Sequence, residues 1–118
     1  MITIKAWCLP STSEDKLNDL HKAIVKAVVS ISELGVKDEN DMICLFPADL
    51  MKYGLGKEII VEIDNVPDVP RKSLMVRIQL AQRVGESVLC LYPDAKIECS
   101  AEEVKPSSGR WSSTEPNS

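Results

Sequence analysis

The sequence predicts an α+β fold: a two-layer sandwich in which two β-α-β units build a four-stranded sheet with two helices on one face. Three observations lead to this fold class. The predicted order is strand, helix, strand, and then the same order again. The spacing from Ile4 to Ile60 nearly equals that from Ile43 to Ile97, which suggests a weak internal duplication. Each unit is long enough for a parallel crossover, which should be right-handed. A chain of 118 residues also suggests a single domain, here 1–104, followed by a tail at 105–118.

The first unit begins with a strand over residues 1–8, in which apolar residues alternate with others and one face can meet a core. The core-facing residues would be Ile2, Ile4 and Ala6. Ser11 and Glu14 then have the spacing of a helix-capping box. The helix that follows should end at Gly35. Its apolar stripe consists of Leu17, Leu20, Ile24, Ala27, Ile31 and Leu34. Residues 42–46 form a short apolar run closed by Pro47, consistent with a buried strand.

The second unit should contain a strand over 58–63, a helix over about 71–91 and a strand over 95–99. Within the helix, Gly85 is expected to allow close packing. The apolar stripe of this helix consists of Leu74, Ile78, Ala81, Val84, Val88 and Leu91. From Lys105 onward the chain is rich in Pro, Ser, Gly and Asn around Trp111, a composition that cannot bury itself.

The composition excludes some classes of binding partner and indicates where in the cell the protein is found. The net charge is −4 with no basic stripe, so we expect no nucleic-acid partner. No apolar run approaches the roughly 20 residues of a membrane helix, so we expect no membrane partner. Lys5 and Trp7 interrupt the start of the chain, where a signal peptide would need an apolar run. We therefore expect a cytoplasmic protein.

Metal and cofactor sites are not expected either. The four cysteines, Cys8, Cys44, Cys90 and Cys99, form no C-x-x-C pair, and His21 is the only histidine. The cysteines are expected to be reduced, buried thiols. We expect His21 to lie on a helix surface rather than to act as a ligand or base.

Two helices on one face of the sheet leave the other face without a cover. A strand as apolar as 42–46 should not face water, so other copies of the same chain are the simplest cover. The sequence therefore predicts an oligomer.

Three short motifs resemble a known family. Residues 47–54 read Pro-Ala-Asp-Leu-Met-Lys-Tyr-Gly, similar to the Pro-Asp-Gln-Leu-Met-Ala-Phe-Gly after the second strand of macrophage migration inhibitory factor. Pro93-Asp94 and Gly109-Arg110-Trp111 match later motifs in the same order. The chain thus resembles the tautomerase superfamily, which also includes 5-carboxymethyl-2-hydroxymuconate isomerase and 4-oxalocrotonate tautomerase. The resemblance implies a trimeric tautomerase-like fold, with three sites between the subunits of a homotrimer.

The chain departs from this family at its catalytic residue. Family members use an amino-terminal proline, whereas Ile2 here is bulky enough that Met1 should be retained in the proline's place. An α-amino group ordinarily titrates near neutral pH, so it can still serve as a base. Ser11 stands where short members carry a substrate-binding arginine. Cys99 stands where macrophage migration inhibitory factor carries an asparagine, and Ile97 where it carries a tyrosine.

The resemblance implies a keto-enol tautomerase or isomerase that acts on small carboxylate substrates, weakened or altered by Met1. The catalytic group would be the Met1 amine. Substrate-binding residues would be Lys37, Arg71, Arg110, Trp111 and Cys99, with no metal and no cofactor. The alternative is a non-catalytic trimeric binding or interaction module on the same scaffold. The sequence leaves open whether the protein is an enzyme.

Overall fold

The computed structural model describes residues 1–47 and 58–103 of the chain. In these ranges, strands and helices alternate in the expected order, with two short 3₁₀ helices between the first helix and the second strand. The elements are β1 (Ile2–Trp7), α1 (Glu14–Val29), η1 (Ser32–Leu34), η2 (Glu39–Asp41), β2 (Met42–Leu45), β3 (Glu58–Val66), α2 (Ser73–Leu91) and β4 (Lys96–Glu103).

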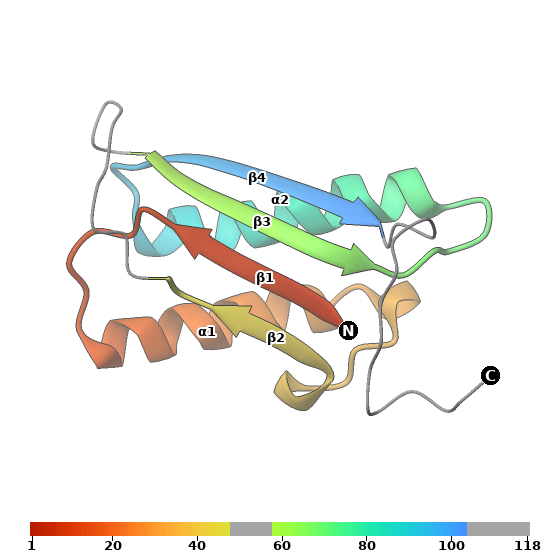
Figure 1. The fold of residues 1–118 in the computed structure, drawn as a ribbon, viewed down its shortest axis with the longest axis horizontal. Helices are drawn as coiled ribbons and strands as arrows, with labels where there is room; N and C mark the ends of the chain where they lie inside the picture. The colour runs from red at the N-terminus through yellow and green to blue at the C-terminus, as the bar shows by residue number, and fades with distance from the viewer. Residues whose placement is uncertain (48–57, 104–118) are drawn as a thin grey trace.

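The four strands form one sheet in the order β2-β1-β3-β4. β1 pairs in parallel with β2, and β3 pairs in parallel with β4. The two units meet at the centre of the sheet, where β1 and β3 are antiparallel. Both helices lie behind the sheet in the view of Figure 1. The predicted two-layer architecture of two β-α-β units is therefore confirmed.

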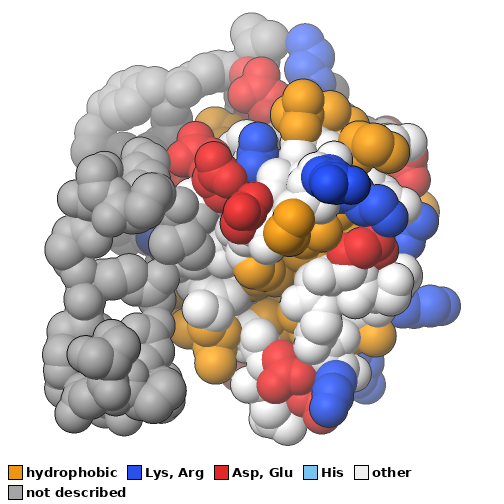
Figure 2. Space-filling view, turned by 90° about the vertical axis from the view of Figure 1, so that its right-hand side faces the viewer, with side chains coloured by type: hydrophobic (Ala, Val, Ile, Leu, Met, Phe, Trp, Pro, Cys, Tyr) orange, Lys and Arg blue, Asp and Glu red, His pale blue; other side chains and the backbone are white. Residues whose placement is uncertain are grey.

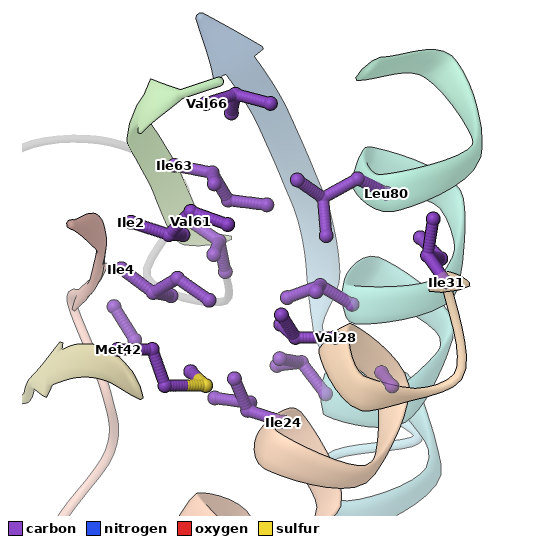
Figure 3. Close-up of a cluster of buried hydrophobic side chains, with 14 of the residues drawn as sticks. Ile2, Ile4, Ile24, Val28, Ile31, Met42, Val61, Ile63, Val66 and Leu80 are labelled. Atoms are coloured by element: carbon purple, nitrogen blue, oxygen red, sulfur yellow. The ribbon is translucent and has the colours of Figure 1, made fainter. Parts of the chain in front are cut away.

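The core lies between the sheet and the helix layer. From the sheet, Ile4 and Ile63 point toward the helices, and they are register partners on the two central strands (Figure 3). From the helices, Ile24, Val28 and Leu80 point back at them. All five side chains are fully buried. A core without polar side chains is what the aliphatic composition allows: no charged or polar residue in the described part of the chain is buried.

The first helix differs from its expectation at both ends. Its N-cap is Ser13, whose hydroxyl accepts a hydrogen bond from the Lys16 amide at 3.2 Å, so the capping box at Ser11 is wrong. The helix ends at Val29, and the stripe continues through the 3₁₀ turn η1, with Ile31 and Leu34 still buried. Gly35 ends that turn rather than the α-helix, in the left-handed conformation at φ 69° that glycine adopts without strain.

The second helix uses a different face from the predicted one. Its buried residues are Val76, Leu80, Val84 and Val88, at a strict spacing of four. Leu74 and Ile78, which the sequence stripe placed in the core, are exposed. Both stripes satisfy helical periodicity and share Val84 and Val88. The first two turns therefore offered two apolar faces, and packing against the sheet selected one.

The strands of the second unit are longer than expected. β3 continues through Val66, into the stretch predicted as a link, and β4 continues through Glu103. Their pairing contains an irregularity between Ile63 and Val66, where Asn65 adopts φ 61°. This is the geometry of a β-bulge, in which an extra residue bends one strand.

The duplication holds for the order of the elements but not for the residue pairs that suggested it. Ile4 is buried, whereas Ile60 is exposed on the opposite face of the sheet. Ile43 is likewise exposed, whereas Ile97 packs against the core. In a strand, a shift of one position moves every side chain to the other face of the sheet. The two residue pairs used to align the units are therefore each out of register by one residue.

β2 is an edge strand with one exposed face. Met42 is buried, but Ile43 and Leu45 are exposed on the face of the sheet away from the helices. Ile60 on β3 is exposed on this same face. The prediction of a fully buried strand is therefore wrong for the single chain, and no described helix covers this side of the sheet (Figure 1).

Gly85 lies where α2 approaches β4. A Cβ at this position would stand 3.4 Å from the Cβ of Cys99 and 4.0 Å from the Cγ2 of Ile97. The close approach explains why a glycine with poor helix propensity occurs in the middle of a long helix. The tail at 105–118 lies outside the described residues. Within the described part, no helix is both long and apolar enough to cross a membrane.

Candidate functional site

The amino-terminal residue Met1, which is more than half exposed, lines a hollow at one end of the sheet. The hollow has a volume of about 410 Å³. Met1 and Ile2 enter it from the start of β1, a central strand. The remaining lining residues are Leu34, Gly35, Val36, Lys37, Asp41, Asn65 and Pro67. Because β3 runs antiparallel to β1, its carboxyl end delivers Asn65 and Pro67 to the same place.

Lys37 reaches this hollow through the turn that follows η1. The left-handed Gly35 redirects the chain, and the backbone amide of Lys37 donates a hydrogen bond to Oδ2 of Asp41 at 2.9 Å. Asp41 itself ends the second 3₁₀ turn, whose start is capped by the Asp38 carboxylate at the Asn40 amide, 2.8 Å away. The ammonium group of Lys37 is therefore carried by a loop with its own hydrogen bonds.

Asn65 is a lining residue that the sequence analysis missed. Its left-handed backbone is part of the bulge in β3, and asparagine is one of the few residues that adopt this conformation readily. The sequence did contain a signal for a bend, because Asp64-Asn65 followed by Val66-Pro67 is typical of a turn. This stretch was interpreted as a link between elements and not as part of a strand. The bulge places an amide side chain at the end of the strand beside Met1.

The other predicted site residues do not all meet Met1 within one chain. Arg71 lies in the turn before α2, at the same end of the sheet, but it does not line the hollow. Cys99 lies on β4, separated from β1 by β3. Arg110 and Trp111 lie outside the described residues. Among the described candidates, one chain therefore brings together Met1 and Lys37.

Cys99 and Cys44 point toward the helix layer and pack against the core. Burial raises the pKa of the Cys44 thiol to about 12. Burial also raises the pKa of the Cys99 thiol to about 11, although a hydrogen bond with the Gly85 backbone lowers it. Both are only partly buried, and Cys90 is exposed, so the prediction of four buried thiols is wrong in part. Both strand thiols remain protonated at neutral pH.

Thiol alkylation checks this assignment. At pH 8 a thiol of pKa about 11 holds roughly a hundredfold less thiolate than one at the ordinary value of 9.0, and the thiolate is the nucleophile. We expect iodoacetamide to label exposed Cys90 first and Cys44 and Cys99 far more slowly, followed by peptide mass spectrometry over time. Equal labelling rates for Cys90 and Cys99 in the native protein would contradict the burial of Cys99 against Gly85.

His21 has a surface environment, as expected. Its Nδ1 atom lies 4.0 Å from Oε2 of Glu39, which joins α1 to the second 3₁₀ turn. No group of three or more potential metal ligands occurs in the described part of the chain.

A second hollow, of about 470 Å³, lies at the opposite end of the sheet. Tyr92 lines it, buried, with its hydroxyl 3.0 Å from the Thr12 hydroxyl and the Lys16 ammonium 4.2 Å from the centre of its ring. The lining mixes Lys16 with the carboxylates of Glu58 and Asp94, so no single ligand charge is favoured. The first hollow is the stronger candidate, because it contains the chain's amino terminus.

Comparison with known proteins identifies the fold. No protein-family model and no curated protein matches the sequence. Among solved structures, a fused 4-OT asymmetric trimer matches 86% of this chain and 85% of that chain, with a TM-score of 0.65 at 12% identity. Macrophage migration inhibitory factor from Toxoplasma gondii matches 95% of this chain and 96% of that one, with a TM-score of 0.62 at 14% identity.

A third structure, FG41 malonate semialdehyde decarboxylase inhibited by 3-bromopropiolate, matches 98% of this chain and 91% of that chain, with a TM-score of 0.57 at 16% identity. At such identities the likeness establishes the fold. The predicted resemblance to the tautomerase superfamily is therefore confirmed at the level of the fold.

Proposed function

We propose that this chain is a tautomerase-superfamily protein that moves a proton within small keto or enol carboxylates, with the amine of Met1 as the acid-base group. The observation that carries the proposal is the shared hollow of Met1 and Lys37. It joins an amine, which can take up and return a proton, to a cation that can hold an anionic substrate. The fold of the solved structures described above gives the proposal its chemical class.

The reaction needs only proton transfers. The neutral Met1 amine takes a proton from the carbon next to the carbonyl group, and the electron pair of that bond moves onto the carbonyl oxygen. The Met1 ammonium group then returns a proton to the enolate oxygen, which gives the enol and leaves the protein unchanged. Ketonisation of an enol runs through the same two proton transfers in reverse. Lys37 would stabilise the substrate carboxylate or the developing enolate oxygen by its charge.

We further propose that the protein acts as a homotrimer. The sheet has two free edges, β2 and β4, on opposite sides, so β2 of one copy can meet β4 of the next in a head-to-tail contact that closes a ring. The fused 4-OT structure is described as a trimer, which supports this assembly. The exposed Ile43, Leu45 and Ile60 would then be covered.

Such a ring would complete the site with residues from a neighbouring copy. Met1 starts β1, whose parallel partner β2 is the free edge, so a neighbour's β4 would come close to Met1. The segment after the neighbour's β4 would then offer Arg110 and Trp111, whereas the Cys99 thiol points toward its own helix layer and would not reach the substrate. Arg71 would add a further cation from the same end of the sheet. In this arrangement Arg110 would supply the positive charge that short family members carry at the position of Ser11.

Phenylpyruvate ketonisation tests the proposal. We expect slow turnover by the full chain whose first residue, checked by intact mass, is Met1. Two extra residues placed before Met1 should reduce kcat/KM by at least about tenfold, because the acid-base group moves out of the hollow. Lys37→Ala and Arg110→Ala should mainly raise KM, because they remove charges that hold the carboxylate.

Lys26→Ala is the matched control, because Lys26 is a cation on α1 that does not line the Met1 hollow. Turnover that is unaffected by the extension would assign the chemistry to another group. No turnover by the unmodified chain would favour the alternative, a trimeric binding module. That alternative is supported by Met1 itself, since a primary amine stands where the family carries a proline.

A further inference from the structure

The first two turns of α2 carry an exposed apolar cluster. Leu74, Met75 and Ile78 are exposed by 63%, 70% and 58%, more than any other large hydrophobic residue in the described part of the chain. They lie on the side of the helix away from Val76 and Leu80, which face the sheet. Figure 2 views this end of the molecule and shows hydrophobic side chains next to both basic and acidic side chains. The proposed trimer does not explain the cluster, because the open sheet face lies on the other side of the molecule.

Cations outnumber carboxylates around this cluster, although the chain is acidic. Glu33, from the first 3₁₀ turn, interacts electrostatically with Lys72 and Arg83. Residues 69–85 contain four cations, Arg71, Lys72, Arg77 and Arg83, and no aspartate or glutamate, whereas the whole chain has a net charge of −4. Arg77 pairs with Glu103 at 3.1 Å, and Arg83 donates to Ser30. Arg71 makes no hydrogen bond or ion pair with any other described residue. Asp68, the nearest acidic residue before the helix, accepts a hydrogen bond from Ser73.

The backbone places these cations at a corner of the molecule. The Lys72 amide donates to the Val69 carbonyl at 2.9 Å, and Arg71 adopts φ 68° in the turn between them. The two helices also differ at their N-termini: α1 has a serine cap with Glu14 and Asp15 in its first turn, whereas α2 has neither a side-chain cap nor an acidic residue there. The positive end of the α2 dipole is therefore offset by the Asp68 carboxylate, which accepts a hydrogen bond from Ser73, and not by an acidic residue of the helix itself.

We propose that this corner, defined by Arg71, Lys72, Leu74, Met75 and Ile78, binds the surface of an anionic lipid bilayer. The three apolar side chains would enter the boundary between headgroups and acyl chains, while the two cations meet lipid phosphates. The corner lines neither of the two hollows described above, so it suits a deformable surface that needs no matching groove.

The acidic net charge does not prevent such binding. At physiological ionic strength charges are screened over roughly 8–10 Å, so the local sign of the corner decides the attraction. The expectation of no membrane partner rested on the lack of a spanning segment, and surface binding needs none. This inference goes beyond the proposed function and does not depend on Met1. It shares Arg71 with the proposed substrate site, so Arg71 is left unchanged in the test below.

Sedimentation with vesicles tests the inference. The full chain is mixed with vesicles of phosphatidylcholine alone or with about 30% phosphatidylserine, a composition that gives a negative surface potential. We expect binding to the anionic vesicles only. The triple variant Leu74→Gln, Met75→Gln, Ile78→Gln should fall to the level of neutral vesicles. Lys72→Ala should bind about fivefold more weakly, the effect of one cation near such a surface.

Leu89→Gln is the matched control, because Leu89 is an exposed leucine on the same helix but far from Arg71 and Lys72. It should bind like the wild type. Glutamine favours helices, so the variants should keep the fold, which circular dichroism checks. No binding to anionic vesicles, or equal binding by the triple variant, overturns the inference. If the triple variant instead abolishes association between trimers in light scattering, the corner binds a second copy of this chain, which also overturns it.

Discussion

Leu80→Ala is expected to lower the free energy of unfolding by about 2–5 kcal/mol. Leu80 is fully buried in the middle of α2, and Figure 3 shows its side chain pointing at Ile63 on the central strand β3. Alanine would remove the atoms that fill the space between the helix and the sheet, and a packed core closes such a cavity only in part. Urea titration followed by circular dichroism measures the change.

Leu74→Ala is the matched control, because it makes the same chemical change on the same helix. Leu74 is exposed, so its truncation should change the free energy of unfolding by no more than about 0.5 kcal/mol. Both variants should be compared at one protein concentration, because assembly adds to apparent stability. If Leu74→Ala cost as much as Leu80→Ala, the buried stripe would be the one that the sequence suggested and not the one that the structure has.

Ile60→Glu is expected to convert the proposed trimer into monomers. Ile60 is exposed on the open face of the sheet, where its register partners are Trp7 on β1 and Glu98 on β4. A carboxylate there would add a second charge beside Glu98 and lose the burial of an isoleucine, worth roughly 1.5–3 kcal/mol per subunit. Light scattering coupled to gel filtration should show the mass fall from three times 13.0 kDa to 13.0 kDa.

Trp7 carries a buried polar atom on the open face of the sheet. It lies on this face beside Ile60, and its indole nitrogen is buried without a hydrogen-bond acceptor among the described residues. A buried donor without a partner costs about 1–3 kcal/mol. Because this nitrogen is already buried within the single chain, it does not bear on how copies assemble.

Leu89→Glu is the control for this experiment. It introduces the same carboxylate at an exposed hydrophobic position, but on the helix layer away from the open face. The control should remain trimeric. A wild-type protein that elutes as a clean monomer would falsify the proposed assembly and, with it, the completion of the Met1 site by a neighbouring copy.

The sequence by itself determined the order and type of the elements. The alternation of Ile2, Ile4 and Ala6 identified the first strand and its buried face, and periodicity located both helices. These features are local, because they depend on side-chain spacing of two in a strand and about 3.6 in a helix. The motifs around Pro47 and Pro93 added the resemblance that led to the correct fold.

The choice between equivalent local patterns needed the tertiary structure. α2 has two apolar faces in its first two turns, and contact with the sheet decided that Val76 and Leu80, rather than Leu74 and Ile78, are buried. Capping shows the same limit: Ser11 and Ser13 both precede α1, and only the path of the chain after β1 made Ser13 the cap.

The candidate site, too, was determined partly by the sequence and partly by the tertiary structure. Lys37 was identified through the family resemblance, but Asn65 joins the hollow only because a bulge in β3 ends beside the start of β1. Strand pairing brings together residues that are far apart in the chain, and no local pattern records its register. The sequence therefore determined which groups are available for chemistry, while the antiparallel pairing of the two central strands decided which of them surround Met1.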